Sequence, residues 1–198
     1  ALTLNGGGPA HINMYTRYSK DFSVKELPHA NAIYRHTVFE KKWPELPQDG
    51  KIMVRIGSHA DFSEELTQAV DAFCATYDAI VCCDHTSGYR GKYEVHSQIL
   101  CAQNQWASPL TKTNLSIHIG EVSGDGFICS ANHVWRVNPD GALRDTFGNL
   151  RRVFMMPEIE FFKHYAKEAA SHHEYLDSLN QEIESVKAQI PELPFSNI

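Results

Sequence analysis

Short apolar runs, separated by stretches with helical spacing, constrain the fold of this chain more than any other feature. Each run is rich in β-branched residues and ends in a glycine or a polar loop, as buried strands do. Successive runs begin 18 to 36 residues apart, which leaves room for a crossover helix between parallel strands. The runs span residues 51–57, 79–83, 115–120, 133–137 and 151–155.

This pattern predicts an α/β fold: a Rossmann-like, doubly wound parallel sheet of five or six strands with flanking helices. A helix should follow the first strand, with N-cap groups offered by Ser58, His59 and Asp61. Residues 95–101 suit a short helix as well as a strand. The apolar face of the first helix is predicted from its spacing to be Leu66, Ala69, Val70, Phe73 and Cys74.

Two further helices are predicted near the C-terminus. Pro157 sits at a natural first helical position, with Glu158 and Glu160 in the first turn, where the helix dipole favours acids. The later helix carries a narrow apolar stripe, which needs a partner surface on this domain or on a neighbouring one. The stripe consists of Leu176, Leu179, Ile183, Val186 and Ile190.

The first fifty residues do not have the pattern of a self-contained domain, because a lone apolar alternation cannot bury its faces without neighbours. We expect residues 1–50 to be a strand end plus a long connector. Residues 51–166 should form one α/β domain, followed by a helix and linker at residues 167–198. The apolar connector residues should pack on something else; they are Ile33, Tyr34, Val38, Phe39 and Trp43.

Charge and composition exclude several classes of function. A formal net charge of -6 and a pI near 6.0 offer no basic patch for nucleic acid and no polybasic stretch for anionic lipid. No apolar run approaches the roughly 20 residues that span a bilayer. We therefore expect a cytoplasmic protein without nucleic-acid or membrane partners.

The five cysteines and eleven histidines show no metal-ligand spacing such as Cys-x-x-Cys or His-x-x-x-His. The cysteines lie mostly inside apolar runs, and the adjacent pair Cys82 and Cys83 would point to opposite faces of a strand. We interpret them as structural thiols in a reducing cytosol and expect no metal site.

Polar residues follow the predicted strands at the point where each strand ends. In an open parallel sheet, ligands bind beyond these carboxyl ends, because helix N-termini and loop amides converge there. The same residue types also cap helices and close turns, so a structural role is the alternative for each. The cleft candidates are Ser58, His59, Asp84, His85, Glu121 and Asp125.

Motifs of common catalytic and dinucleotide sites do not occur in the sequence. There is no Gly-x-Gly-x-x-Gly, and residues 120–126 have the wrong spacing for one. There is no Gly-x-Ser-x-Gly nucleophile elbow. Residues 123–126, Ser-Gly-Asp-Gly, fit a turn better than a magnesium diphosphate site, which needs a distant Asn and a helix N-terminus.

Three segments, in the right order, resemble thiamine-diphosphate-dependent enzymes. Residues 8–13, Gly-Pro-Ala-His-Ile-Asn, are similar to the stretch that closes the pyrimidine-binding domain of that family. Residues 118–121, with Trp-Arg-Val-Asn-Pro-Asp-Gly at 135–141 and Arg-Asp at 144–145, look like the late strands of one central domain. That domain belongs to the 2-succinyl-5-enolpyruvyl-6-hydroxy-3-cyclohexene-1-carboxylate synthases of menaquinone biosynthesis. Residues 193–198 are similar to the segment that opens the diphosphate-binding domain.

The resemblance implies that residues 1–50 are the end of a preceding pyrimidine-binding domain plus a connector. It implies that residues 51–166 are the central α/β domain and residues 167–198 a helix and linker into a diphosphate-binding domain. The central domain would be a non-catalytic part, structural or regulatory, of a longer transferase or lyase. The parent would decarboxylate a 2-keto acid, 2-oxoglutarate in the menaquinone case, and transfer or release the acyl-anion equivalent. It would hold thiamine diphosphate and magnesium between other domains, in a homodimer or homotetramer. The family's catalytic and cofactor-binding residues have no positions in this sequence. The fragment alone should therefore bind no cofactor, and its partners would be the N- and C-terminal domains of the same protein.

One loop departs from the family pattern. In the menaquinone synthases a Lys-Arg pair follows the His-Ile-Gly strand and supplies charge for an anionic substrate, whereas this chain has Asp125 and Gly126. Reversed charge would weaken carboxylate binding and favours a related lyase or decarboxylase of another biosynthetic pathway. Two alternatives stay open: a self-sufficient small-molecule enzyme using Asp84, His85 and Glu121, and a ligand-sensing module using the strand-end cleft.

Overall fold

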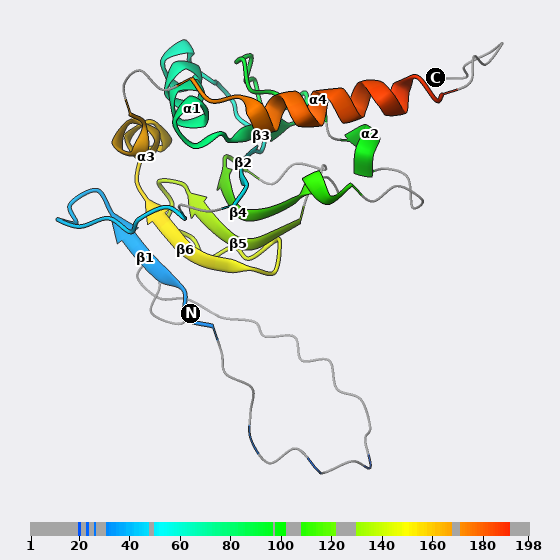
Figure 1. Ribbon diagram of the computed structural model, residues 1–198. Coiled ribbons are helices and arrows are strands. Elements are labelled where there is room, and N and C mark those ends of the chain that lie inside the picture. The colour runs from blue at the N-terminus through cyan, green and yellow to red at the C-terminus, as the bar shows by residue number, and fades with distance from the viewer. Residues whose placement is uncertain are drawn as a thin grey trace. The chain divides into compact units, whose positions relative to one another are not determined.

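Figure 1 shows the computed structural model of the chain. The structure describes residues 20, 23, 26, 31–47, 50–96, 98–101, 108–121, 130–167 and 171–190. The chain divides into two compact units, Ala1–Asn31 and Ala32–Ile198, and nearly all described residues belong to the second. The segments 8–13 and 193–198, which carry part of the family resemblance, and the cleft candidate Asp125 lie outside the described residues.

Six strands form one sheet in which all neighbours run parallel. The order across the sheet is β1-β6-β5-β4-β2-β3. This arrangement confirms the predicted α/β fold class. The strands are β1 (Tyr34–Thr37), β2 (Ile52–Ile56), β3 (Ile80–Cys83), β4 (Lys112–Ile119), β5 (Ser130–Val137) and β6 (Leu150–Met155).

Strands β2 to β6 overlap the five predicted runs, although β4 and β5 each begin three residues earlier than predicted. β1 lies in the segment predicted to be a connector. Its sequence, Tyr-Arg-His-Thr, has no apolar alternation, so the sequence offers no signal for it. β1 forms because its backbone pairs with β6, from Tyr34 opposite Arg152 to Thr37 opposite Met155. The connector therefore contributes an edge strand to the sheet.

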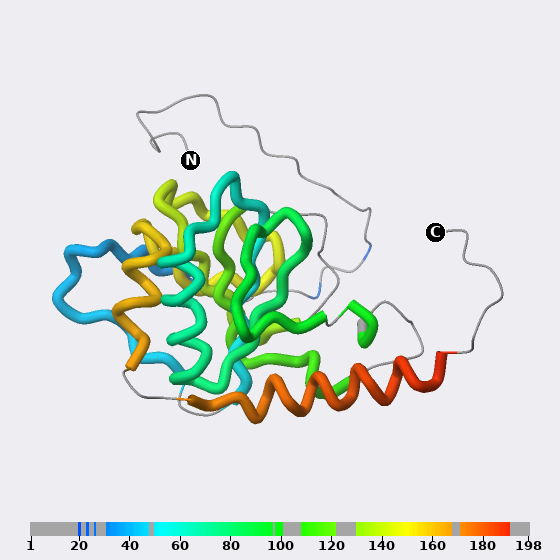
Figure 2. Tube along the Cα trace, turned by 90° about the horizontal axis from the view of Figure 1, so that it is seen from above, coloured from blue at the N-terminus to red at the C-terminus, as the bar shows by residue number. Residues whose placement is uncertain are grey.

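Helices cover both faces of the sheet, as a doubly wound fold requires. Helices α1 (Glu64–Tyr77) and α3 (Glu158–Tyr165) lie side by side on one face. Helices α2 (Gln98–Cys101) and α4 (Glu174–Lys187) lie on the other, and Figure 2 shows α4 running along that side. A short 3-10 helix, η2 (Pro109–Thr111), precedes β4. Among the described residues, no helix has the length and apolar character that crossing a bilayer demands.

Helix α1 buries the five predicted apolar residues, but its N-cap differs from the prediction. The Ser63 hydroxyl accepts a hydrogen bond from the Leu66 N–H at 3.1 Å, so the helix begins at Glu64. The predicted caps were wrong because the backbone of Ser58 pairs instead with the end of β4. The helix ends at Asp78, which adopts the left-handed conformation (φ 48°).

The apolar stripe of α4 finds its partner on the same domain. Leu179 and Ile183 of the stripe are buried against Met53 and Ile80 of the sheet, and Leu176 and Val186 pack partly buried against the same cluster. Tyr175, which the prediction did not include, is buried with them. The prediction was wrong for Ile190, which lies beyond the end of α4 and is 56% exposed.

Residues 95–101, for which a short helix and a strand were both open, begin with strand-like pairing and end in a helix. The backbone around Val95 first bonds β3, and α2 follows directly.

Candidate functional site

The order of the strands reverses at β2, which lies between β3 and β4. The chain passes from β2 to β3 on one side and then crosses to β4 on the other. In doubly wound folds the crevice beyond the carboxyl ends of two such strands is the usual ligand site. Here those ends carry the predicted candidates Ser58, His59 and Glu121.

The backbone of the chain closes this crevice. The Ser58 N–H donates to the Glu121 carbonyl at 2.9 Å, and the Glu121 N–H donates to the Ser58 carbonyl at 3.0 Å. The Gly57 N–H donates to Ile119 at 2.9 Å. A Cβ atom at Gly57 would overlap the Glu121 carbonyl oxygen, so only glycine permits this approach. The strand ends are thus brought together, as predicted, but they pair with each other.

Glu158, the first residue of α3, occupies the position where an anionic ligand would meet a helix N-terminus. Its carboxylate accepts from the Gly120 N–H and from His59 Nε2, both at 2.9 Å. His59 Nδ1 lies 2.9 Å from the Gly57 carbonyl, so both ring nitrogens face acceptors and the protonated ring fits best. Burial alone would lower the pKa of His59, but the hydrogen bond and charge of Glu158 outweigh it and raise the pKa.

The loop after β3 lies beside these residues, since the His59 N–H donates to the Thr86 carbonyl at 3.1 Å. The Asp84 carboxylate accepts from the Thr86 N–H at 2.8 Å and from its hydroxyl at 2.6 Å, which closes a turn. His85 is exposed on this loop. Asp84 therefore has the structural role of closing a turn, which was the alternative to a role in ligand binding.

The Glu121 side chain points to the loop after β5, where it pairs with Arg144. Arg144 also lies 3.4 Å from the Asp140 carboxylate. Asp140 in turn receives two hydrogen bonds from Arg136, at 2.6 and 3.2 Å. Burial is the largest single influence on the pKa of Asp140 and raises it, but the hydrogen bonds from Arg136 and Ala142 and the charges of Arg136 and Arg144 together lower the pKa. This charge network stabilises loops and exposes no unpaired carboxylate for catalysis.

A row of three buried polar side chains crosses the sheet face on which α4 lies. Pairing sets Arg55 opposite His118 and His118 opposite Arg136, and all three are more than nine-tenths buried. The ring of Phe147 lies over the Arg55 guanidinium at 4.2 Å. Burial, and then the charges of Arg136 and Arg55, lower the pKa of His118 to about 4. The sequence signal for this row is an arginine inside a buried strand. The predicted candidates all follow strands, so they do not include it.

Three described cysteines lie in the core. Cys74, Cys82 and Cys83 are buried and form no disulfide. Burial raises the pKa of Cys74 well above its ordinary value and that of Cys83 to about 12, so the reactive thiolate is disfavoured. Within the described ranges, no group of three His, Cys, Asp or Glu side chains could hold a metal ion.

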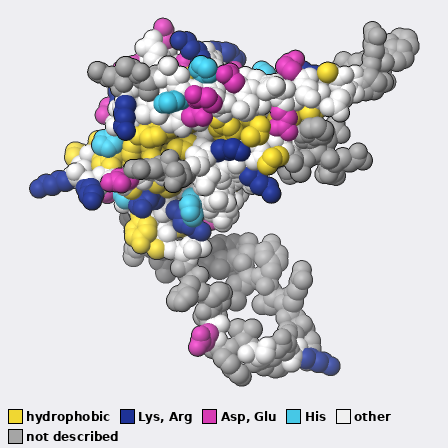
Figure 3. Space-filling model, in the orientation of Figure 1, with side chains coloured by type: hydrophobic (Ala, Val, Ile, Leu, Met, Phe, Trp, Pro, Cys, Tyr) yellow, Lys and Arg dark blue, Asp and Glu magenta, His cyan; other side chains and the backbone are white. Residues whose placement is uncertain are grey.

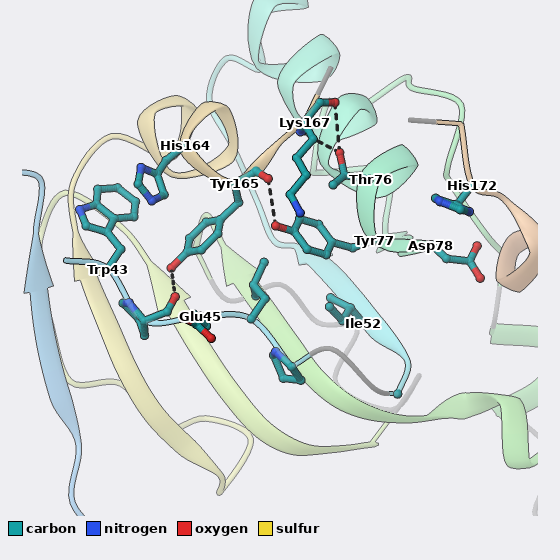
Figure 4. Close-up of a pocket in the computed structure, with 14 residues that line it drawn as sticks. Trp43, Glu45, Ile52, Thr76, Tyr77, Asp78, His164, Tyr165, Lys167 and His172 are labelled. Carbon is teal, nitrogen blue, oxygen red and sulfur yellow. Dashed lines mark hydrogen bonds between the residues drawn. The ribbon is translucent and has the colours of Figure 1, made fainter. Parts of the chain in front are cut away.

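Two cavities lie at the opposite, amino end of the strands. Both are lined by residues 45–47, part of the segment 43–47 that we call the strap. The first, the helix-end cavity of about 670 Å³, lies between the strap and the last turns of α1 and α3 (Figure 4). The Tyr165 hydroxyl donates to the Pro44 carbonyl at 2.7 Å, and the Tyr77 hydroxyl to the Tyr165 carbonyl at 3.0 Å. These bonds tie the strap to both helices.

The second, the strand cavity of about 340 Å³, lies on the other side of the strap. Leu115, Trp135 and Arg152 line it from β4, β5 and β6. Figure 3 shows a band of hydrophobic side chains at the level between helices and lower strands, with histidine and basic side chains beside it. Neither cavity was predicted from the sequence, because both lie at the amino ends of the strands and depend on contacts between distant segments.

No protein-family model matches the chain, and no curated protein matches it either. The chemistry open to the molecule must therefore come from its own geometry. At the carboxyl end that geometry supports a structural role, and at the amino end it leaves room for a ligand.

Proposed function

We propose that this chain is the non-catalytic central domain of a thiamine-diphosphate-dependent enzyme, similar to the menaquinone synthases. In this role it spaces and orients the two domains that bind the cofactor. One observation carries the proposal: the domain's own Ser58–Glu121 bridge and Glu158 carboxylate fill the crevice at the strand ends. A domain whose usual ligand site is filled in this way contributes to its parent enzyme by spacing and orienting the other domains.

The segment behind the resemblance supports a structural role as well. Trp135 is buried in the core, and Arg136 holds the Asp140 carboxylate. The Asn138 side chain accepts from the Asp140 N–H at 3.0 Å, and Gly141 completes the turn with a φ of 58°. A Trp-Arg-Val-Asn-Pro-Asp-Gly run thus builds a strand end and a tight turn, which are features of a scaffold.

The described residues do not fit the magnesium diphosphate group of the cofactor. They include no cluster of three metal ligands. The Glu158 carboxylate already accepts the hydrogen bond of the Gly120 N–H at the α3 end of the crevice. An anion placed there would face this carboxylate. In the proposal, thiamine diphosphate therefore belongs to other domains of the parent, where it supplies the electron sink for decarboxylation.

A titration of the purified chain tests the first half of the proposal. Thiamine diphosphate with magnesium should give no saturable heat, and 2-oxoglutarate should release no carbon dioxide with this chain alone. Saturable cofactor binding would refute the assignment. Turnover that disappears in His85→Ala would instead support the self-sufficient enzyme.

The second half is tested by the coding sequence on either side of the chain. We expect a glutamate-bearing pyrimidine-binding domain before it and a Gly-Asp-Gly motif with a downstream Asn after it. A protein expressed from that longer sequence should decarboxylate a 2-keto acid only when thiamine diphosphate and magnesium are added. Flanking sequence without these motifs would contradict the proposal.

A further inference from the structure

The strand cavity contains two arginines that form no direct ion pair with a carboxylate of the described residues. The charge of Arg152 still reaches Glu40, because it contributes, after the hydrogen bond with His36, to the lowered pKa of that carboxyl. Arg151 and Arg152 both line the cavity, and neither appears in an ion pair within the described part of the chain. The one carboxylate in the lining, Glu45, is exposed on the strap. Two guanidinium groups on one small cavity make it a place for an anion.

Arg152 is held in a fixed position. Its guanidinium lies 5.4 Å from the ring centre of Tyr34 and 5.5 Å from that of Trp135, so aromatic rings of β1 and β5 flank it. One terminal N–H donates to His36 Nε2 at 2.9 Å. Since an arginine only donates, Nε2 must accept, and the proton of His36 sits on Nδ1.

That tautomer connects Arg152 indirectly to a carboxylate. The Nδ1 proton of His36 is donated to Glu40, 2.8 Å away, and the His36 ring stacks on Phe154 with ring centres 4.9 Å apart. Glu40 therefore orients the arginine through a neutral imidazole without contacting it. The guanidinium keeps its positive charge and the donors that His36 does not use.

Apart from Glu45 and His133, the rest of the lining is apolar or aromatic. Trp135 and Leu115 form the sheet side, and Leu46 and Pro47 of the strap form the other side. Trp135, Leu115 and Leu46 are each more than nine-tenths buried, so these walls are part of the core. A volume of about 340 Å³ is at the small end of the range of ligand pockets.

We propose that the strand cavity binds a small organic oxyanion, a carboxylate or phosphate monoester on a flat apolar body. The oxyanion meets Arg152 and Arg151, and the flat body lies between Trp135 and the strap. This site is at the amino end of the strands, away from the crevice at the carboxyl end. The inference is independent of the proposed function, because it uses no feature of the parent enzyme.

Calorimetric titration with four probes tests the chemistry. Benzoate and phenyl phosphate should bind saturably, and the tighter of the two distinguishes a carboxylate site from a phosphate site. Benzamide, which has the same ring without the charge, should bind more weakly by a factor of roughly ten or more. Inorganic phosphate, which lacks the ring, should bind more weakly than phenyl phosphate. Equal binding of benzamide and benzoate, or no saturable binding of either oxyanion, would overturn the proposal.

Matched variants test the location. Arg152→Gln should weaken oxyanion binding roughly tenfold, with Arg152→Lys intermediate because it keeps charge but not the planar fork. Arg35→Gln, on the adjacent strand and exposed, removes the same charge outside the cavity and should change affinity less than about twofold.

Two more variants keep the test decisive. Lys167→Gln changes a cation of the helix-end cavity and should leave binding intact. Arg151→Gln provides a second change in the strand cavity should Arg152→Gln unfold the chain, which circular dichroism would reveal. Equal losses in Arg35→Gln and the cavity variants, or loss only in Lys167→Gln, would refute the assigned site.

Discussion

The two ends of this sheet differ in how their polar side chains are paired. At the carboxyl end, backbone amides, a histidine and a glutamate of the described residues form hydrogen bonds with one another across the crevice. At the amino end, a strap separates two cavities, one of which contains arginines that form no direct ion pair with a carboxylate of the described residues. In a doubly wound fold, the topology determines where polar loops meet. The side chains there determine whether a ligand can enter.

The largest effect should come from opening the carboxyl end at its tightest point. Gly57→Ala places a methyl group onto the Glu121 carbonyl oxygen, so the bridge between β2 and β4 must separate. We expect a loss of about 3 kcal/mol in the free energy of unfolding, measured by urea denaturation. Gly148→Ala is the control: its positive φ of 77° costs roughly 1 kcal/mol, but nothing lies within 4 Å of the added atom. Equal costs in the two variants would contradict the close approach.

A smaller effect should follow from removing the carboxylate of the crevice. Glu158→Ala leaves the Gly120 N–H and the His59 ring without their acceptor. The expected loss in the free energy of unfolding is about 2 kcal/mol. Glu160→Ala, on the exposed side of the same helical turn, should stay within roughly 0.5 kcal/mol of wild type. A Glu158→Ala variant as stable as Glu160→Ala would mean that the crevice is not held by this contact.

At the amino end, the bonds that tie the strap should each be worth less. Tyr165→Phe removes the hydroxyl that donates to the Pro44 carbonyl and should cost about 1 kcal/mol. Tyr34→Phe, whose side chain is more than half exposed, is the control and should cost almost nothing in thermal denaturation. If the two variants melt alike, the strap does not depend on this bond.

The smallest effect is a dependence on pH. Because the folded pKa of His59 is raised, its protonation adds stability that is complete below the ordinary pKa of about 6.5 and is lost as the pH rises through the folded value. The stability advantage of wild type over His59→Gln should therefore shrink between pH 6 and pH 9. Urea denaturation at several pH values measures it, and an advantage that grows with pH would contradict the assigned ion pair.

The sheet could be predicted because buried parallel strands carry their own signal. The residues at 52–56 are apolar almost throughout, and glycine follows them directly, so strand and loop are both visible in the sequence. β1 could not be predicted, because its four residues are stabilised by pairing with β6 rather than by an apolar pattern. Local sequence describes elements that bury their own side chains better than elements that depend on a distant strand.

The candidate site was predicted only in part, for a related reason. Strand ends indicated that Ser58, His59 and Glu121 would converge, and they do. Whether they leave a cleft depends on Glu158, which lies 99 residues from His59 in the chain and was interpreted only as a helix-dipole acid. The strand cavity depends likewise on Arg152 and His36, which lie 116 residues apart. Contacts of that range have no signature in one sequence.

The edge strand has a mechanical consequence. β1 runs parallel to β6, so a pull on the chain before Ile33, directed along the strand, loads the backbone hydrogen bonds between them together in shear. His36 lies within β1 and holds Arg152 of β6. Tension that shifts β1 would therefore be transmitted to the guanidinium of Arg152, and the edge strand would act as a tether between the preceding chain and the strand cavity.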